Sequence, residues 1–227
     1  MGNYEKALQF YKKSKDFAIE KMGKDHYRVA TASHNMARIY MWQENYKKAL
    51  ELLQITLSID INNLGEKHPD IASNYNTFGD FYIAQKQYER ASDYYQKALA
   101  IQLSIFGNDH KEVAYVYDKL GRLNQEIKKF DKAMLYFDKA LAIHKKIYSE
   151  PNKFIAESYE QIGQLYYDSG SFQNALLSFE KAEKANTKSN INKLNTNDFI
   201  SNSIDVNLLL RITNGKAKTH ISLYKQD

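Results

Sequence analysis

The stretch HPDIASNYNTFGDFYIAQKQYERASDYYQKALAIQLSIFG, residues 68–107, decides the fold. Its apolar side chains recur at helical spacing as far as Tyr82, and the polar residues 85–87 interrupt this stripe. The stripe resumes at Tyr88 and stops at Gly107, a residue type that suits a left-handed helix end. The stretch therefore predicts a helix A, a short turn and a longer helix B.

The same pattern recurs along the chain at an interval of 42 residues. The positions that keep this interval are an aromatic (Tyr4, Tyr46, Tyr88, Phe130, Phe172), an alanine (Ala7, Ala49, Ala91, Ala133, Ala175), a loop glycine (Gly23, Gly65, Gly107), a histidine (His26, His68, His110) and a small residue in helix A (Ala37, Gly79, Gly121, Gly163). One helix pair cannot cover both of its apolar sides, so a fixed period indicates a stack of pairs. We expect an array over 1–185, with a half repeat at 1–25 and full repeats from about 26, 68, 110 and 152.

These positions resemble the tetratricopeptide repeat (TPR). In the second copy the family's pattern reads Tyr75, Phe78, Gly79, Tyr82, Ala91, Tyr95 and Ala98. The 42-residue period and the loop at 64–72 resemble the kinesin-light-chain type of this repeat. The resemblance implies an all-α, right-handed superhelical solenoid of antiparallel helix pairs. The chain departs from the pattern at Thr56, Asn124, Ser149 and Asn152.

The tail, residues 186–227, is rich in asparagine and leaves three structures open. A degenerate fifth repeat acting as a cap would place its core at Ile204, Leu208, Ala217 and Ile221. A β-hairpin that turns at Asn214-Gly215 would pair Leu210 with Thr219 and Leu208 with Ile221. The third is a disordered linker towards a further domain. Because the chain starts inside a helix B, we interpret it as a fragment.

Composition argues against several classes of protein. The chain has no cysteine, which excludes disulfides, thiolate zinc sites and iron–sulfur clusters. No apolar run approaches the roughly 20 residues that span a bilayer. The net charge of +5 combines 32 basic with 27 acidic residues, too mild and mixed to indicate nucleic acid. We expect a cytoplasmic protein with neither nucleic-acid nor membrane partners.

The histidines and acids form no pattern of catalytic or metal-binding chemistry. His26, His68 and His110 lie a full repeat apart, too far to share one metal ion. We interpret them as structural residues of the loop that enters each helix A. No nucleophile constellation or glycine-rich phosphate loop occurs. We therefore expect no enzyme activity, no cofactor and no metal.

One side of each helix A is a candidate binding surface. In the repeat family, this side of the helix faces the groove of the superhelix. The resemblance carries the groove positions to His34, Asn35 and Arg38, then Asn76, Thr77 and Asp80, then Tyr115, Asp118, Lys119 and Arg122, and finally Glu160, Gln164 and Tyr167. The same side also carries Thr31, Met41, Ser73, Ile83, Gln125, Glu157 and Gln161. Asparagine can pair with a peptide backbone, and arginine can bind a carboxylate with two hydrogen bonds.

The sequence thus predicts a scaffold or adaptor that binds an extended peptide segment of a partner protein, with an acidic part of that segment near Arg38 and Arg122. The carboxylate-clamp pattern of chaperone-tail adaptors in this family does not fit, because the matching positions read His34, Arg38, Thr77, Tyr115 and Lys119. The alternative is a regulatory array whose effector domain, enzymatic or DNA-binding, lies outside this chain. Self-assembly through a terminal helix is a third possibility, and the sequence leaves the oligomeric state open.

Overall fold

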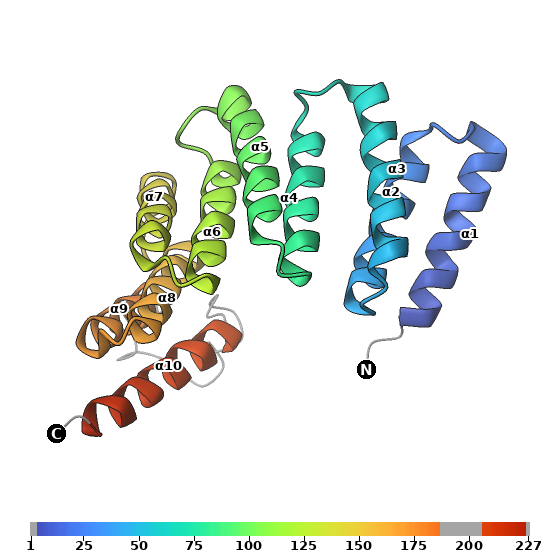
Figure 1. Cartoon of the computed structure of the whole chain (residues 1–227). Helices are drawn as coiled ribbons and strands as arrows, with labels where there is room; N and C mark the ends of the chain where they lie inside the picture. Colours follow the sequence, from blue (N-terminus) through green and yellow to red (C-terminus); the bar gives the residue numbers. More distant parts are fainter. Residues whose placement is uncertain (1–3, 187–205, 226–227) are drawn as a thin grey trace, which may run out of the picture. The chain divides into compact units, whose positions relative to one another are not determined.

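The computed structural model of the 227-residue chain describes residues 4–186 and 206–225, which form ten helices and no strand (Figure 1). The chain divides into two compact units, Met1–Ile105 and Phe106–Asp227. The first unit holds α1 (Tyr4–Met22), α2 (Tyr27–Trp42), α3 (Tyr46–Leu64), α4 (Pro69–Ala84) and α5 (Tyr88–Phe106). The second holds α6 (Lys111–Glu126), α7 (Phe130–Ile147), α8 (Lys153–Asp168), α9 (Phe172–Asn186) and α10 (Val206–Tyr224).

Consecutive helices pack against each other within each unit. The contacts run from α1 through α2 and α3 to α4 in the first unit, and from α6 through α7, α8 and α9 to α10 in the second. Even-numbered helices from α2 to α8 correspond to helix A, and α3, α5, α7 and α9 to helix B. The predicted all-α architecture of paired helices is confirmed, while the handedness of the array stays a prediction.

In the second, third and fourth copies, the small residue of helix A is a glycine that lies directly against an aromatic ring of the same copy's helix B. A Cβ atom added at Gly79 would lie 2.3 Å from the Tyr95 ring, and one at Gly121 would lie 2.5 Å from the Phe137 ring. The alanines that recur at the start of helix B in the four full copies, Ala49, Ala91, Ala133 and Ala175, are fully buried. The two helices therefore approach each other closely, and this approach depends on the missing side chain of the glycine.

The loop histidines act as N-caps of helix A. Nδ1 of His26, His68 and His110 accepts a hydrogen bond from the backbone N–H two residues later, each at 3.2 Å. In the fourth copy Asn152 has the same role, since its Oδ1 accepts from Phe154 N–H at 2.8 Å. The structural interpretation of the histidines is confirmed, and the departure at Asn152 is a substitution of one capping acceptor by another.

We expect His68→Ala to lower the free energy of unfolding by about 1 kcal/mol, because the first N–H groups of α4 lose their side-chain acceptor. His68→Asn should be nearly neutral, as Asn152 fills the equivalent position. Urea denaturation followed by circular dichroism at pH 8 measures both variants. Equal losses for alanine and asparagine would contradict the capping role.

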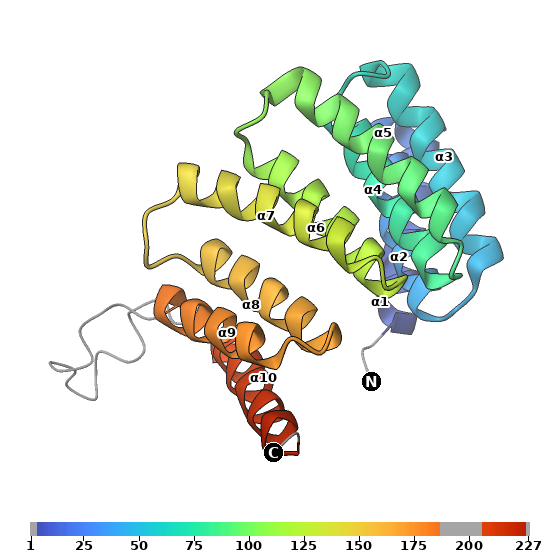
Figure 2. The same cartoon turned by 60° about the vertical axis from the view of Figure 1, so that its left-hand side comes forward.

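The C-terminal helix α10 corrects the prediction for the tail. Leu208, Leu210, Thr219 and Ile221 all belong to one helix, so the β-hairpin is wrong. The buried face of α10 contains Leu208, Ile212, Gly215 and Thr219, whereas Ala217 and Ile221 are exposed. Only Leu208 of the expected core positions in the described part of the tail is buried, and Ile204 lies outside the described residues. Helix α10 packs on α9 and, less extensively, on α8 (Figure 2).

Candidate functional site

One position of helix A carries a polar, partly or fully buried side chain in all four copies. It is occupied by His34 and Asn76 in the first unit and by Asp118 and Glu160 in the second. Burial lowers the pKa of His34, and the nearby Arg38 adds to this decrease. Burial also raises the pKa of Glu160. The position is therefore less accessible to solvent than an ordinary exposed helix face in every copy.

In the first unit a pocket of about 440 Å³ lies beside α2. Its lining includes the predicted residues His34 and Asn35, together with Tyr27, Asp60 and Asn74. Asn74 Nδ2 donates to Asp60 Oδ2 at 2.7 Å, yet burial still raises the pKa of the Asp60 carboxyl. The pocket is therefore polar and contains a carboxyl group held away from bulk water.

The other predicted residues of the first unit lie outside this pocket. Arg38 is exposed, with its guanidinium 5.7 Å from the Trp42 ring centroid. Asp80 Oδ1 accepts a hydrogen bond from the Tyr95 hydroxyl at 2.6 Å, so this carboxylate also supports the helix pair. Thr77 donates to the Ser73 carbonyl at 3.1 Å. Asn76 is 6% exposed, and its buried Oδ1 has no hydrogen-bond partner.

In the second unit a pocket of about 440 Å³ brings together Tyr115, Asp118, Lys119 and Arg122 of α6 with Glu157 and Gln161 of α8. We call it the α6–α8 pocket. Lys111, Glu112, His144, Tyr148 and Phe154 complete its lining. Asp118 Oδ1 and Gln161 Oε1 are both buried without a hydrogen-bond partner in the described chain. Four predicted residues thus meet in one pocket.

The Asp118 carboxyl is the most perturbed group of this pocket. Burial raises its pKa from 3.8 to about 7, against the opposing effect of the Arg122 charge, and the Glu157 charge raises it further. A carboxyl that is half protonated near neutral pH can switch between accepting and donating a hydrogen bond. No sequence pattern indicated this property, since it depends on the burial of this side chain in the fold and on the nearby charges of Arg122 and Glu157.

Because its pKa is raised in the folded chain, Asp118 stabilises the fold when protonated, and this contribution disappears as the pH rises from about 4 through 7. Between pH 5 and 8 we expect the free energy of unfolding to fall by about 3 kcal/mol as this carboxyl ionises. Asp118→Asn should remove this loss and be more stable than wild type at pH 8. Urea denaturation of both proteins at pH 5 and 8 measures the difference, and a difference that does not change with pH would contradict it.

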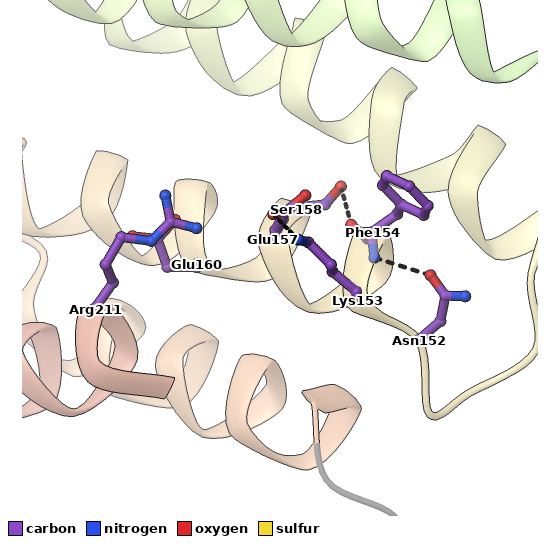
Figure 3. Close-up of polar contacts among 7 residues, drawn as sticks. All are labelled: Asn152, Lys153, Phe154, Glu157, Ser158, Glu160 and Arg211. Atoms are coloured by element: carbon purple, nitrogen blue, oxygen red, sulfur yellow. Dashed lines mark hydrogen bonds and ion pairs between the residues drawn. The ribbon is translucent and has the colours of Figure 1, made fainter. Parts of the chain in front are cut away.

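The two glutamates of the predicted face in α8, Glu157 and Glu160, form ion pairs within the second unit. Arg211 Nη2 of α10 lies 3.9 Å from Glu160 Oε2, and Lys153 Nζ lies 3.8 Å from Glu157 Oε1 (Figure 3). Tyr167 shares a hydrogen bond of 3.4 Å with Ser222 of α10. Asp168 accepts from Gln125 and Gln164, each at 2.7 Å. Glu160, Gln164 and Tyr167 are therefore engaged by the chain itself and do not line the α6–α8 pocket.

Sequence reasoning missed the residues at the end of helix B that complete both pockets. Asp60 bonds to Asn74, and His144 Nδ1 lies 2.8 Å from Ser158 Oγ. In both pairs the two residues are 14 apart, and the pairs themselves are two repeats apart. A search for polar residues at this recurring spacing would have found them. Burial lowers the pKa of the His144 imidazole.

Within residues 4–186 and 206–225, no cluster of three or more acids and histidines is arranged to hold a metal ion. Over the same part of the chain, no helix is both long and apolar enough to cross a membrane. The cytoplasmic location stays a prediction.

Stacked helix pairs with a polar helix-A face define a helical-repeat protein. Family profiles described as tetratricopeptide repeat match residues 28–104 and 70–146, and a second such profile matches 156–189. The chain belongs to the tetratricopeptide repeat family. No curated protein matches the chain as a relative.

Solved structures of similar fold include kinesin-light-chain-like proteins. The nearly identical TPR-like repeats of a protein described as a kinesin light chain, from Podosopora anserina, share 19% identity over 84% of this chain and 90% of theirs, with a TM-score of 0.68. BtubC (BKLC) from P. vanneervenii shares 18% identity over 99% of this chain and 90% of its own, with a TM-score of 0.69. At these identities the likeness establishes the fold alone.

Proposed function

We propose that the helix-A faces of this array bind an extended peptide segment of a partner protein, so that the chain acts as a scaffold or adaptor. The observation that carries the proposal is a set of buried acceptor atoms without partners on these faces: Asn76 Oδ1, Asp118 Oδ1 and Gln161 Oε1. Buried polar atoms in folded proteins normally have a hydrogen-bond partner. An extended peptide supplies backbone N–H donors along its length, which suits the acceptors on the two successive A helices of the second unit, Asp118 Oδ1 of α6 and Gln161 Oε1 of α8.

Exposed side chains on the same faces support contacts with the side chains of the bound segment. Arg38 and Arg122 are exposed, and a guanidinium binds a carboxylate with two hydrogen bonds. Tyr115 is 46% exposed beside Lys119 and offers apolar area with little loss of rotamer entropy. We therefore propose that the segment contains acidic residues near the two arginines. Membership of the TPR family agrees, because such repeats are generally protein-interaction modules.

A random-peptide display selection against the full chain tests the proposal. We expect selected peptides to lose at least tenfold in affinity for a variant with Tyr115→Ser and Arg122→Glu. The matched control is Lys132→Glu on α7, an exposed residue of helix B that undergoes the same charge reversal. Circular dichroism verifies that all variants are folded.

Peptides that bind wild type and the Tyr115/Arg122 variant equally, yet lose affinity for the Lys132 variant, would contradict the proposal and indicate the helix-B side. The regulatory role beside a separate effector domain stays a prediction, because none of these contacts bears on it.

A further inference from the structure

The α6–α8 pocket contains two buried acceptors with no donor. Asp118 Oδ1 lies on α6 and Gln161 Oε1 on α8, and only 9% of Gln161 is exposed. A buried acceptor without a partner destabilises the fold because it has lost water and gained nothing. Two such acceptors in one pocket indicate a ligand that donates hydrogen bonds.

The cations around the pocket do not satisfy these acceptors. Lys119 Nζ lies 5.3 Å from the centroid of the Tyr115 ring, and Lys153 Nζ lies 3.8 Å from Glu157 Oε1. Arg122 is exposed and acts on Asp118 through its charge, without donating to Oδ1. The interior of the pocket therefore has acceptors without donors, while Lys111 and Arg122 of its lining are exposed and Lys119 is half-buried beside Tyr115.

The carboxyl group at position 118 indicates that the ligand's hydrogen-bond donor is charged and not neutral. The equivalent residue of α4 is Asn76, so the fold accepts a neutral amide at the same place. At Asp118 the chain instead places a carboxyl near a second one, Glu157, whose charge is unfavourable to it. A cation between them would relieve this repulsion and form charge-assisted hydrogen bonds, which are roughly twice as strong as neutral ones.

The remaining wall of the pocket suits an aliphatic stem. The Tyr148 and Phe154 rings stack at 5.1 Å between centroids, and both line the pocket. Lysine and arginine place their methylene groups along such apolar surfaces while the charged end reaches a polar group. A volume of about 440 Å³ lies within the range of ligand pockets.

We propose that the α6–α8 pocket binds the cationic end of a lysine or arginine side chain of the partner segment, with Asp118 and Gln161 as acceptors. This specificity rests on the proposed function, since it names a residue type within the peptide bound there. The partner segment would then contain a basic residue in addition to the acidic residues proposed to contact Arg38 and Arg122.

Binding should strengthen with pH because only the ionised Asp118 offers its full charge. The titratable groups that line the pocket with this carboxyl are Lys111, Glu112, Tyr115, Lys119 and Arg122 of α6, His144 of α7, Tyr148, and Glu157 of α8. Of these, the charges of Arg122 and Glu157 act on Asp118. Since Asp118 has a pKa of about 7 in the free chain, its ionised fraction rises about tenfold from pH 6 to pH 8. The affinity for a cation should rise by about the same factor.

The experiment is an NMR titration of the full chain with Nα-acetyl-lysine amide, Nα-acetyl-arginine amide, Nα-acetyl-glutamine amide and Nα-acetyl-norleucine amide. We expect the two cationic amides to shift the resonances of the Gln161 side-chain amide and the Phe154 ring. The affinity derived from these shifts should be about tenfold higher at pH 8 than at pH 6. The norleucine amide has a similar stem without the charge and should cause no comparable shift.

Asp118→Asn should lower the affinity for the cationic amides at least tenfold at pH 8, whereas Lys132→Glu should leave this affinity unchanged. Equal binding of the glutamine amide, or no shift with the cationic amides at either pH, would overturn the proposal. These outcomes are separable from the proposed function. Display-selected peptides that need Tyr115 and Arg122 but tolerate Asp118→Asn would support peptide binding and overturn only the cation pocket.

Discussion

Phe179→Ala should lower the free energy of unfolding by about 3–5 kcal/mol and release α10 from the second unit. The Phe179 ring is buried between two glycines. Because glycine has no side chain, neither residue could fill the space that the ring leaves. A Cβ on Gly163 of α8 would lie 2.8 Å from this ring, and one on Gly215 of α10 would lie 2.5 Å from it. The ring also belongs to the same core as Leu208 and Ile212 of α10. Its removal leaves a cavity in contact with three helices.

Urea denaturation and hydrogen exchange of the α10 amides measure the two effects. Leu177→Ala is the matched control, because this leucine lies on the same helix and is 54% exposed. We expect the control to change stability by less than about 0.5 kcal/mol. Unchanged exchange in α10, together with a loss below about 1 kcal/mol for Phe179→Ala, would contradict the role of the ring as the anchor of α10.

Gly121→Ala should lower the free energy of unfolding by about 3 kcal/mol, although alanine is the better helix former by about 1 kcal/mol. The added Cβ would lie 2.5 Å from the Phe137 ring, which is only 1% exposed and has little room to move. Steric overlap in a close-packed core outweighs the helix preference. Urea denaturation again measures the change.

The chain itself provides a compensating variant. In the first copy the equivalent pair is Ala37 and Leu53, which share one core cluster. We therefore expect the double variant Gly121→Ala/Phe137→Leu to be no less stable than Phe137→Leu alone. Additive losses in this double-mutant cycle would show that the glycine is not required by the ring.

Much of the fold could be predicted from the sequence because its period is regular. The interval of 42 residues fixed the helix pairs, and Gly79 and Gly121 lie against rings as expected of small residues between helices. The tail could not be predicted in this way. Asn214-Gly215 has the local signature of a hairpin turn, but Gly215 serves in α10 as the close contact for Phe179. Tertiary packing overrides the local turn preference there.

The candidate site could be predicted only as a set of positions. The resemblance placed Asn76 and Asp118 among the groove positions of helix A, but it could not give their burial or their lack of partners. Those properties depend on the neighbouring helix and on residues of helix B, such as His144, that the repeat pattern does not mark. The perturbed pKa of Asp118 has the same origin.

Mapping a display-selected peptide on the isotopically labelled full chain by NMR tests the central claim most directly. We predict that the largest intermolecular contacts and shifts involve the side-chain amides of Asn76 and Gln161 and the ring of Tyr115, all on helix A. Contacts confined to exposed helix-B residues such as Lys132 and Leu177, with the helix-A amides unmoved, would contradict the account.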